Sequence, residues 1–131
     1  MINIKNTQNN MNAKEIGTKL VELCSQGKNA DALKTLYSPD IVSIEAAAAP
    51  GMDRETRGID GVVGKNKWWM ENHEVHSAKC EGPFPHDDRF AVHFNYDVTN
   101  KPSGKRFNMD EMALYTTKAG KIVREEFFYT T

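Results

Sequence analysis

Three glutamates occupy positions where a carboxyl group could exchange protons with a small molecule. Glu111 and Glu125 stand among apolar residues of the strand-like stretch 105–129, and Glu45 lies near the end of another, 41–46. A half-buried strand alternates polar and apolar residues, so carboxyl groups on apolar faces indicate a pocket. Burial disfavours the ionised form of a carboxyl group and moves its pKa towards neutrality. If Glu45 and Glu111 face one cavity, one can act as an ionised base and the other as a protonated donor.

Each glutamate also has a purely structural interpretation. Glu45 could sit in water at a strand end, and Glu111 could pair with a basic residue across the sheet. Glu125 either lines the pocket or forms a cross-strand salt bridge, with Lys79 or Arg106 as partner.

Aromatic side chains are the second group of candidate ligand contacts. Trp68 and Trp69 are adjacent, so on a helix they point about 100° apart and only one can face straight into a cavity. We expect Trp69 to do so, while core packing explains at least one of the two equally well. Phe94 and Tyr96 share one face of a strand, with the Tyr96 hydroxyl as a polar contact, and Phe127 shares a face with the last of the glutamates.

Metal and nucleotide sites have little support in the sequence. His73-Glu74-Val75-His76 is one residue short of the zinc motif His-Glu-x-x-His and falls at a predicted helix end. The chain contains neither a Gly-x-Gly-x-x-Gly nor a Walker-type loop. We therefore predict a protein that uses no metal and no cofactor.

Composition narrows the class of protein. The 131 residues carry 17 basic and 18 acidic side chains and no basic run, so neither nucleic acid nor an anionic membrane is an expected partner. No apolar run approaches the roughly 20 residues of a membrane span. Cys24 and Cys80 are interpreted as free thiols, which predicts a cytoplasmic location. We expect residues 1–11 to be a disordered tail and residues 12–131 to form one domain.

The pattern of elements predicts an α+β fold. Asn12 and Glu15 form a capping-box pair before a helix that ends near Gly27. A curved, mostly antiparallel sheet should follow the helices and pack against them. The expected helices are 13–27, 29–37 and 59–72, and the expected strands are 41–46, 75–82, 89–99, 105–116 and 121–130, with a loop at 47–57.

Several strings between residues 12 and 129 resemble one superfamily. These are LVELCSQGKNADALKTLYSPDIVSIE, a Gly-Ile-Asp-Gly helix entry followed by Trp68-Trp69, and Gly-Lys-Ile-Val leading into Arg-Glu-Glu-Phe-Phe-Tyr. They are similar to the nuclear-transport-factor-2-like (NTF2-like) superfamily and, within it, to the SnoaL-like polyketide cyclase group. The resemblance implies a cone-shaped sheet with three helices on its concave face and a deep apolar pocket at the open end.

The resemblance also implies roles for particular residues. Isomerases of this superfamily place a general base at the end of the first strand, where Glu45 stands, and an acid on the penultimate strand, where Glu111 or Asp110 matches. We therefore expect a pocket for a small apolar carbonyl-bearing molecule, in a cofactor-free isomerase or cyclase that abstracts a proton next to the carbonyl. The alternatives are a non-catalytic or stress-associated binding module and a chiefly structural dimer.

A homodimer is expected in each case. The helices should cover the face of strand 89–99 that carries its aromatic residues, which leaves apolar residues exposed on the opposite sheet face. The residues of that opposite face are His93, Asn95, Met112, Leu114 and Phe128.

Overall fold

The structure is a computed structural model that describes residues 10–48 and 50–130. Its first described helix, α2 (Ala13–Ser25), begins with the predicted capping box: the Asn12 side chain accepts a hydrogen bond from the Glu15 amide at 2.9 Å, and the Glu15 carboxylate accepts one from the Asn12 amide at 3.0 Å. Two further helices follow, α3 (Asn29–Leu36) and α4 (Ile59–Asn72), neither of which has a side-chain N-cap. The bounds of α4 are those predicted. Most of the predicted disordered tail, residues 1–9, lies outside the described residues.

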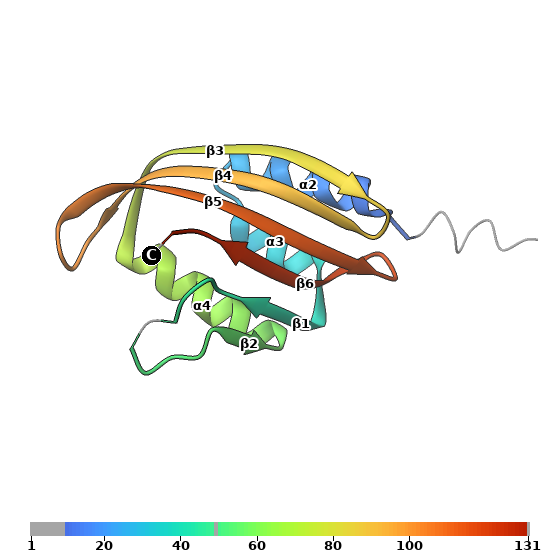
Figure 1. The fold of residues 1–131 in the computed structure, drawn as a ribbon, viewed down its shortest axis with the longest axis horizontal. Coiled ribbons are helices and arrows are strands. Elements are labelled where there is room, and N and C mark those ends of the chain that lie inside the picture. Colours follow the sequence, from blue (N-terminus) through green and yellow to red (C-terminus); the bar gives the residue numbers. More distant parts are fainter. Residues whose placement is uncertain (1–9, 49, 131) are drawn as a thin grey trace, which may run out of the picture.

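Six strands form one mixed, curved sheet in the order β2-β1-β6-β5-β4-β3 (Figure 1). The four C-terminal strands pair antiparallel with their neighbours in chain order, as predicted, whereas β1 pairs parallel with β6. The helices lie on one side of the sheet, with α2 behind the long strands (Figure 1). The strands are β1 (Tyr37–Ile44), β2 (Glu55–Arg57), β3 (His73–His86), β4 (Arg89–Asn100), β5 (Lys105–Lys118) and β6 (Lys121–Phe128).

Several elements differ from the prediction, and the largest differences are in three strands. β1 begins at Tyr37, so Pro39 lies inside a strand and does not merely end a helix. β2 was expected to be loop, and a strand of three residues is too short to show an alternation. β3 continues through Pro83 and Pro85 to His86, because it is an edge strand with a bulge between Glu81 and Phe84, where proline does not interrupt a ladder.

The core lies between α2 and the inner face of β4. Phe90, Val92 and Phe94 are buried on that face, as the alternation of the strand predicts, and Phe90 stacks on Tyr115 of β5 at 4.8 Å. Gly17 of α2 lies so close to the sheet that an added Cβ would stand 2.6 Å from the Cβ of Pro83. The helix and the sheet therefore pack at a distance that only glycine permits here.

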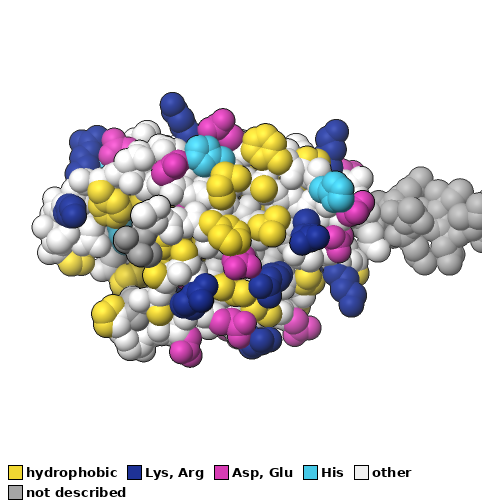
Figure 2. Space-filling view, in the orientation of Figure 1, with side chains coloured by type: hydrophobic (Ala, Val, Ile, Leu, Met, Phe, Trp, Pro, Cys, Tyr) yellow, Lys and Arg dark blue, Asp and Glu magenta, His cyan; other side chains and the backbone are white. Residues whose placement is uncertain are grey.

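The outer face of the sheet carries both apolar and charged side chains. Figure 2 shows apolar side chains gathered over the middle of this face, with basic and acidic side chains around them. Phe84, Met112 and Phe128 are exposed large apolar residues of strands β3, β5 and β6. Among the described residues no helix is long and apolar enough to cross a membrane.

Candidate functional site

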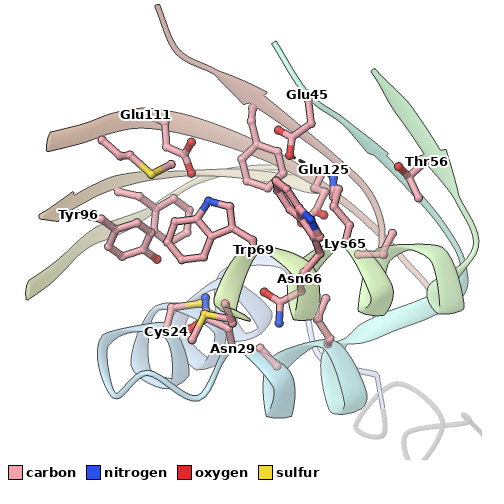
Figure 3. A pocket seen from close by; sticks show the side chains of 18 of the residues that line it. Cys24, Asn29, Glu45, Thr56, Lys65, Asn66, Trp69, Tyr96, Glu111 and Glu125 are labelled. Carbon is pink, nitrogen blue, oxygen red and sulfur yellow. Dashed lines mark ion pairs between the residues drawn. The ribbon is translucent and has the colours of Figure 1, made fainter. Parts of the chain in front are cut away.

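A cavity of about 680 Å³ lies between the helices and the inner face of the sheet. Glu45 and Glu111 reach into it from the sheet, Lys65 and Trp69 from α4, and Cys24 stands on the helical side (Figure 3). Most of the residues predicted for the site therefore come together at one place. Those that line the cavity are Glu45, Trp68, Trp69, Phe94, Tyr96, Glu111, Glu125 and Phe127.

Asp110, the alternative acid, does not reach the cavity. Its carboxylate lies on the outer face of the sheet, 2.6 Å from Nε2 of His93, and accepts a hydrogen bond from Asn95 at 3.2 Å. Successive side chains of a strand point to opposite faces, so Glu111 on the inner face requires Asp110 on the outer one. Of the two acids, Glu111 is therefore the one that lines the cavity.

Glu125 lies at the floor of the cavity and is only 3% exposed. The Tyr37 hydroxyl donates to its Oε1 at 2.5 Å, and the Ser43 hydroxyl donates to its Oε2 at 2.7 Å. Burial raises the pKa of Glu125, while these two hydrogen bonds act in the opposite direction. Both carboxylate oxygens are thus held by uncharged hydroxyl groups.

Of the two interpretations of Glu125, the cross-strand salt bridge with Lys79 or Arg106 is not the one observed. Arg106 instead pairs with Asp97 at 2.8 Å on the outer face, and Lys79 is paired in register with Asn95 of that face. Glu125 points inward, so the sheet itself separates its carboxylate from both cations.

Lys65 is a cavity residue that the sequence analysis missed. Its ammonium group donates to the Ser43 hydroxyl at 2.7 Å, lies 3.2 Å from Oε1 of Glu45, and stands 5.7 Å from the centre of the Phe127 ring. A signal was present, because Lys65 stands four residues before Trp69 and so shares its side of the helix. The Lys65 ammonium therefore contacts both Glu45 and Ser43, and the Ser43 hydroxyl in turn donates to the buried Glu125.

Glu111 differs from the other two glutamates. Among the described residues no group forms a hydrogen bond or ion pair with its carboxyl group, although Glu111 lines the cavity. Burial raises the pKa of Glu111 to about 7, with further increases from the charges of Glu45 and Glu125 and a decrease from Lys65. Near neutral pH this carboxyl group can therefore both take and give a proton.

The cysteine in the cavity is poorly suited to act as a nucleophile at neutral pH. Burial raises the pKa of the Cys24 thiol to about 12. The thiolate is the reactive form of cysteine, and it is scarce at neutral pH when the pKa is this high. Glu111 is thus the cavity group best placed for proton transfer.

The tryptophans take different positions. Trp69 is partly buried, stacks on His73 at 4.4 Å and lies 6.2 Å from Tyr96, whereas Trp68 is 52% exposed at the edge of the cavity.

The histidines of the sequence His73-Glu74-Val75-His76 do not form a metal site. His76 instead forms a hydrogen bond with the Thr99 hydroxyl at 2.7 Å. Within residues 10–48 and 50–130, no group of three His, Cys, Asp or Glu side chains is placed to hold a metal ion.

Comparisons with known proteins agree with this architecture. Residues 11–129 match a family model described as a SnoaL-like domain. A crystal structure of a candidate SnoaL-like polyketide cyclase from Mesorhizobium loti is 44% identical, covers 91% of this chain and 100% of its own, and superposes with a TM-score of 0.85. No curated protein sequence matches the chain.

Two more distant structures share the fold. An NTF2-like protein from Burkholderia thailandensis is 21% identical, with 92% of each chain covered and a TM-score of 0.77. A candidate isomerase from Bacillus subtilis is 15% identical, with 92% of this chain and 90% of that one covered and a TM-score of 0.74. At these identities the likeness concerns the cone-shaped α+β fold alone.

Proposed function

Because the chain belongs to the SnoaL-like domain family, we propose that its cavity binds a small apolar molecule with a carbonyl group and that Glu111 moves a proton at the neighbouring carbon. No cofactor takes part in this proposal. The observation that carries it is a carboxyl group with no protein partner among the described residues, in a cavity walled mainly by apolar and aromatic side chains. The pKa of Glu111, about 7, suits a group that both removes and returns a proton at neutral pH.

Lys65 is the proposed partner of Glu111. An ammonium group has three N–H donors, and two of them are directed to Ser43 and Glu45. The third meets no acceptor among the described residues and is available for the carbonyl oxygen of a ligand. When the Glu111 carboxylate takes the proton, the electrons of the C–H bond form an enolate, and its negative oxygen is stabilised by the adjacent ammonium.

Return of the proton completes the reaction. Delivery to the same carbon gives exchange with solvent, delivery to another carbon gives isomerisation, and attack of the enolate carbon on a second carbonyl group closes a ring. The roles differ from the family-based expectation that Glu45 is the base and Glu111 the donor. In the proposal, Glu45 instead holds Lys65 in place through their 3.2 Å contact.

The test follows hydrogen exchange and needs no knowledge of the product. Aromatic ketones, polyketide-like lactones and steroids are incubated with the protein in heavy water, with a chelator present, and deuterium at the carbon next to the carbonyl is measured by NMR. We expect at least one compound to exchange faster with protein than without it. Glu111→Gln should lower the protein-dependent exchange rate by about 10²-fold or more.

Asp110→Asn is the matched control, because it removes the neighbouring carboxylate from the outer face. It should exchange like the wild type. Unchanged exchange in Glu111→Gln, or no exchange with any compound, contradicts the proposal. Ligand-induced changes in tryptophan emission without exchange would instead support a non-catalytic binding module.

A further inference from the structure

Glu125 is a buried carboxyl group that has no role in the proposed reaction. It lies opposite Ser43 in the parallel register of β6 with β1, and Ser43 is fully buried. Tyr37, at the start of β1, donates its hydroxyl to the other oxygen of the same carboxyl group. Buried polar side chains are retained where hydrogen bonds satisfy them, and these three residues satisfy one another.

Lys65 sets the direction of the hydrogen bonds in this group. An ammonium group can only donate, so the Ser43 oxygen accepts from Lys65 at 2.7 Å. A hydroxyl group has one hydrogen, and that of Ser43 is directed to Oε2 of Glu125 at 2.7 Å. A carboxyl group retains acceptor capacity in either protonation state. The Ser43 hydroxyl is thus held from both sides and cannot turn without losing one of its partners.

We propose that Glu125 is a positioning residue of the cavity, which holds the Ser43 hydroxyl and thereby fixes the Lys65 ammonium where the carbonyl oxygen of the ligand binds. The inference rests on the proposed function, since Lys65 stabilises the enolate there. A lysine side chain is a flexible four-carbon stem, so one contact does not fix its ammonium. Ser43 at 2.7 Å and Glu45 at 3.2 Å together determine where the third N–H points.

Two matched pairs of variants separate positioning from support of the fold. Ser43→Thr keeps the hydroxyl, and Ser43→Val has the same shape without it. Glu125→Gln keeps an acceptor for Ser43, and Glu125→Met removes the acceptor while keeping a side chain of similar length. The first member of each pair should behave like the wild type, and the second should release Lys65. Urea unfolding measures the stability of all four, and either pair is sufficient if the other does not fold.

The position of Lys65 is measured by acetylation, which needs no ligand. N-hydroxysuccinimidyl acetate reacts with neutral amines, and hydrogen bonds to an ammonium group favour its charged form. Peptide mass spectrometry gives the rate at each lysine. We expect Lys65 to react about three- to tenfold faster in Ser43→Val and Glu125→Met than in their matched variants and the wild type. Lys121 is the internal control, because its ammonium donates to the Thr35 carbonyl at 2.8 Å and neither residue lines the cavity.

Three results of the acetylation overturn the inference. An equal increase at Lys121 would mean that the variants loosen the whole fold. Equal Lys65 rates within each pair would mean that neither side chain positions the ammonium. A difference in the Ser43 pair without one in the Glu125 pair would make Ser43 sufficient alone.

Deuterium exchange separates failure of this inference from failure of the proposed function. With a compound that exchanges, Ser43→Val and Glu125→Met should lower kcat about tenfold and leave KM within about twofold, because Lys65 acts on the charge that develops on the enolate oxygen. The expected acetylation pattern without exchange by the wild type supports positioning of Lys65 and contradicts proton transfer. Exchange that is equal in all four variants contradicts the inference and leaves proton transfer intact.

Discussion

Glu111 is distinguished from Glu45 and Glu125 by the absence of a described partner for its carboxyl group. Glu45 contacts Lys65, and Glu125 accepts hydrogen bonds from two hydroxyl groups. A carboxyl group that is partly removed from water and has no cationic or hydrogen-bonding partner keeps its proton to a higher pH. Holding the Glu111 carboxyl group without a partner lowers the stability of the folded chain, which is expected of a group that serves a chemical role, as proposed for Glu111.

The stability of the protein should report this proton. The pKa of Glu111 rises from an ordinary 4.5 to about 7 in the folded chain, so between these pH values the folded state holds a proton that the unfolded state releases. The free energy of unfolding must therefore fall as pH increases through this range, by about 1–3 kcal/mol. Urea unfolding at a series of pH values measures the fall.

Glu111→Gln supplies the comparison for this measurement, because it keeps the shape and removes the titration. Its stability should vary less over the same pH range and exceed that of the wild type at pH 8. Parallel curves for the two proteins would mean that Glu111 titrates normally.

Of the residues predicted for the site, Asp110 alone does not line the cavity. Alternation within strand 89–99 predicted that Phe94 and Tyr96 face inward, whereas the choice between Glu111 and Asp110 was left open. The sequence pattern could not reveal that the Glu125 carboxylate accepts hydrogen bonds from Tyr37 and Ser43, because these contacts join residues more than eighty positions apart. Lys65 was missed because a lysine on a helix is usually solvated.

Among the elements, α2 is packed most tightly against the sheet. Gly17→Ala would bring a methyl group within 2.6 Å of the Pro83 side chain and 2.9 Å of Phe90. Although alanine favours helix, the clash should dominate and destabilise the protein by about 1–3 kcal/mol. Thermal and denaturant unfolding measure the change.

Gly64→Ala in α4 is the matched control, since a Cβ there meets no atom within 4 Å. It should raise stability by about 0.5–1 kcal/mol through helix propensity alone. Equal effects of the two substitutions would show that α2 does not pack as closely as described.

The elements themselves were largely predictable, and the exceptions have physical causes. α4 was recovered in full despite its two internal glycines, because its apolar residues recur at helical spacing. β1 was predicted to start four residues late, since Ser38-Pro39 resembles a helix stop, and its parallel pairing with β6 is a long-range contact that no local pattern encodes.

At the scale of the whole molecule, the outer sheet face is the proposed dimer interface. Met112 pairs in register with His93 on one side and with Phe128 on the other, so the exposed side chains of Met112 and Phe128 are neighbours. Figure 2 shows apolar side chains gathered over the middle of this face. Burying such a cluster against a second copy stabilises association. Sedimentation at micromolar concentration should give twice the chain mass.

Met112→Lys should shift this equilibrium to the monomer by placing a charge in the contact. Val63→Lys is the control, because Val63 is a similarly exposed apolar residue on α4, away from the sheet face. A monomeric wild type would show that there is no dimer. A dimer that survives Met112→Lys and dissociates with Val63→Lys would place the interface on another face of the molecule.

The central claim is that Glu111 exchanges the proton, and the pH dependence of deuterium exchange tests it most directly. The rate above the protein-free background should rise as pH increases through about 7 and then level off, because only the ionised Glu111 can accept a proton. Asp110→Asn should follow the same curve, and Glu111→Gln should stay at the background. A rate that falls above pH 7 would make Glu111 the donor and Glu45 the base, and a rate that survives Glu111→Gln would contradict the account altogether.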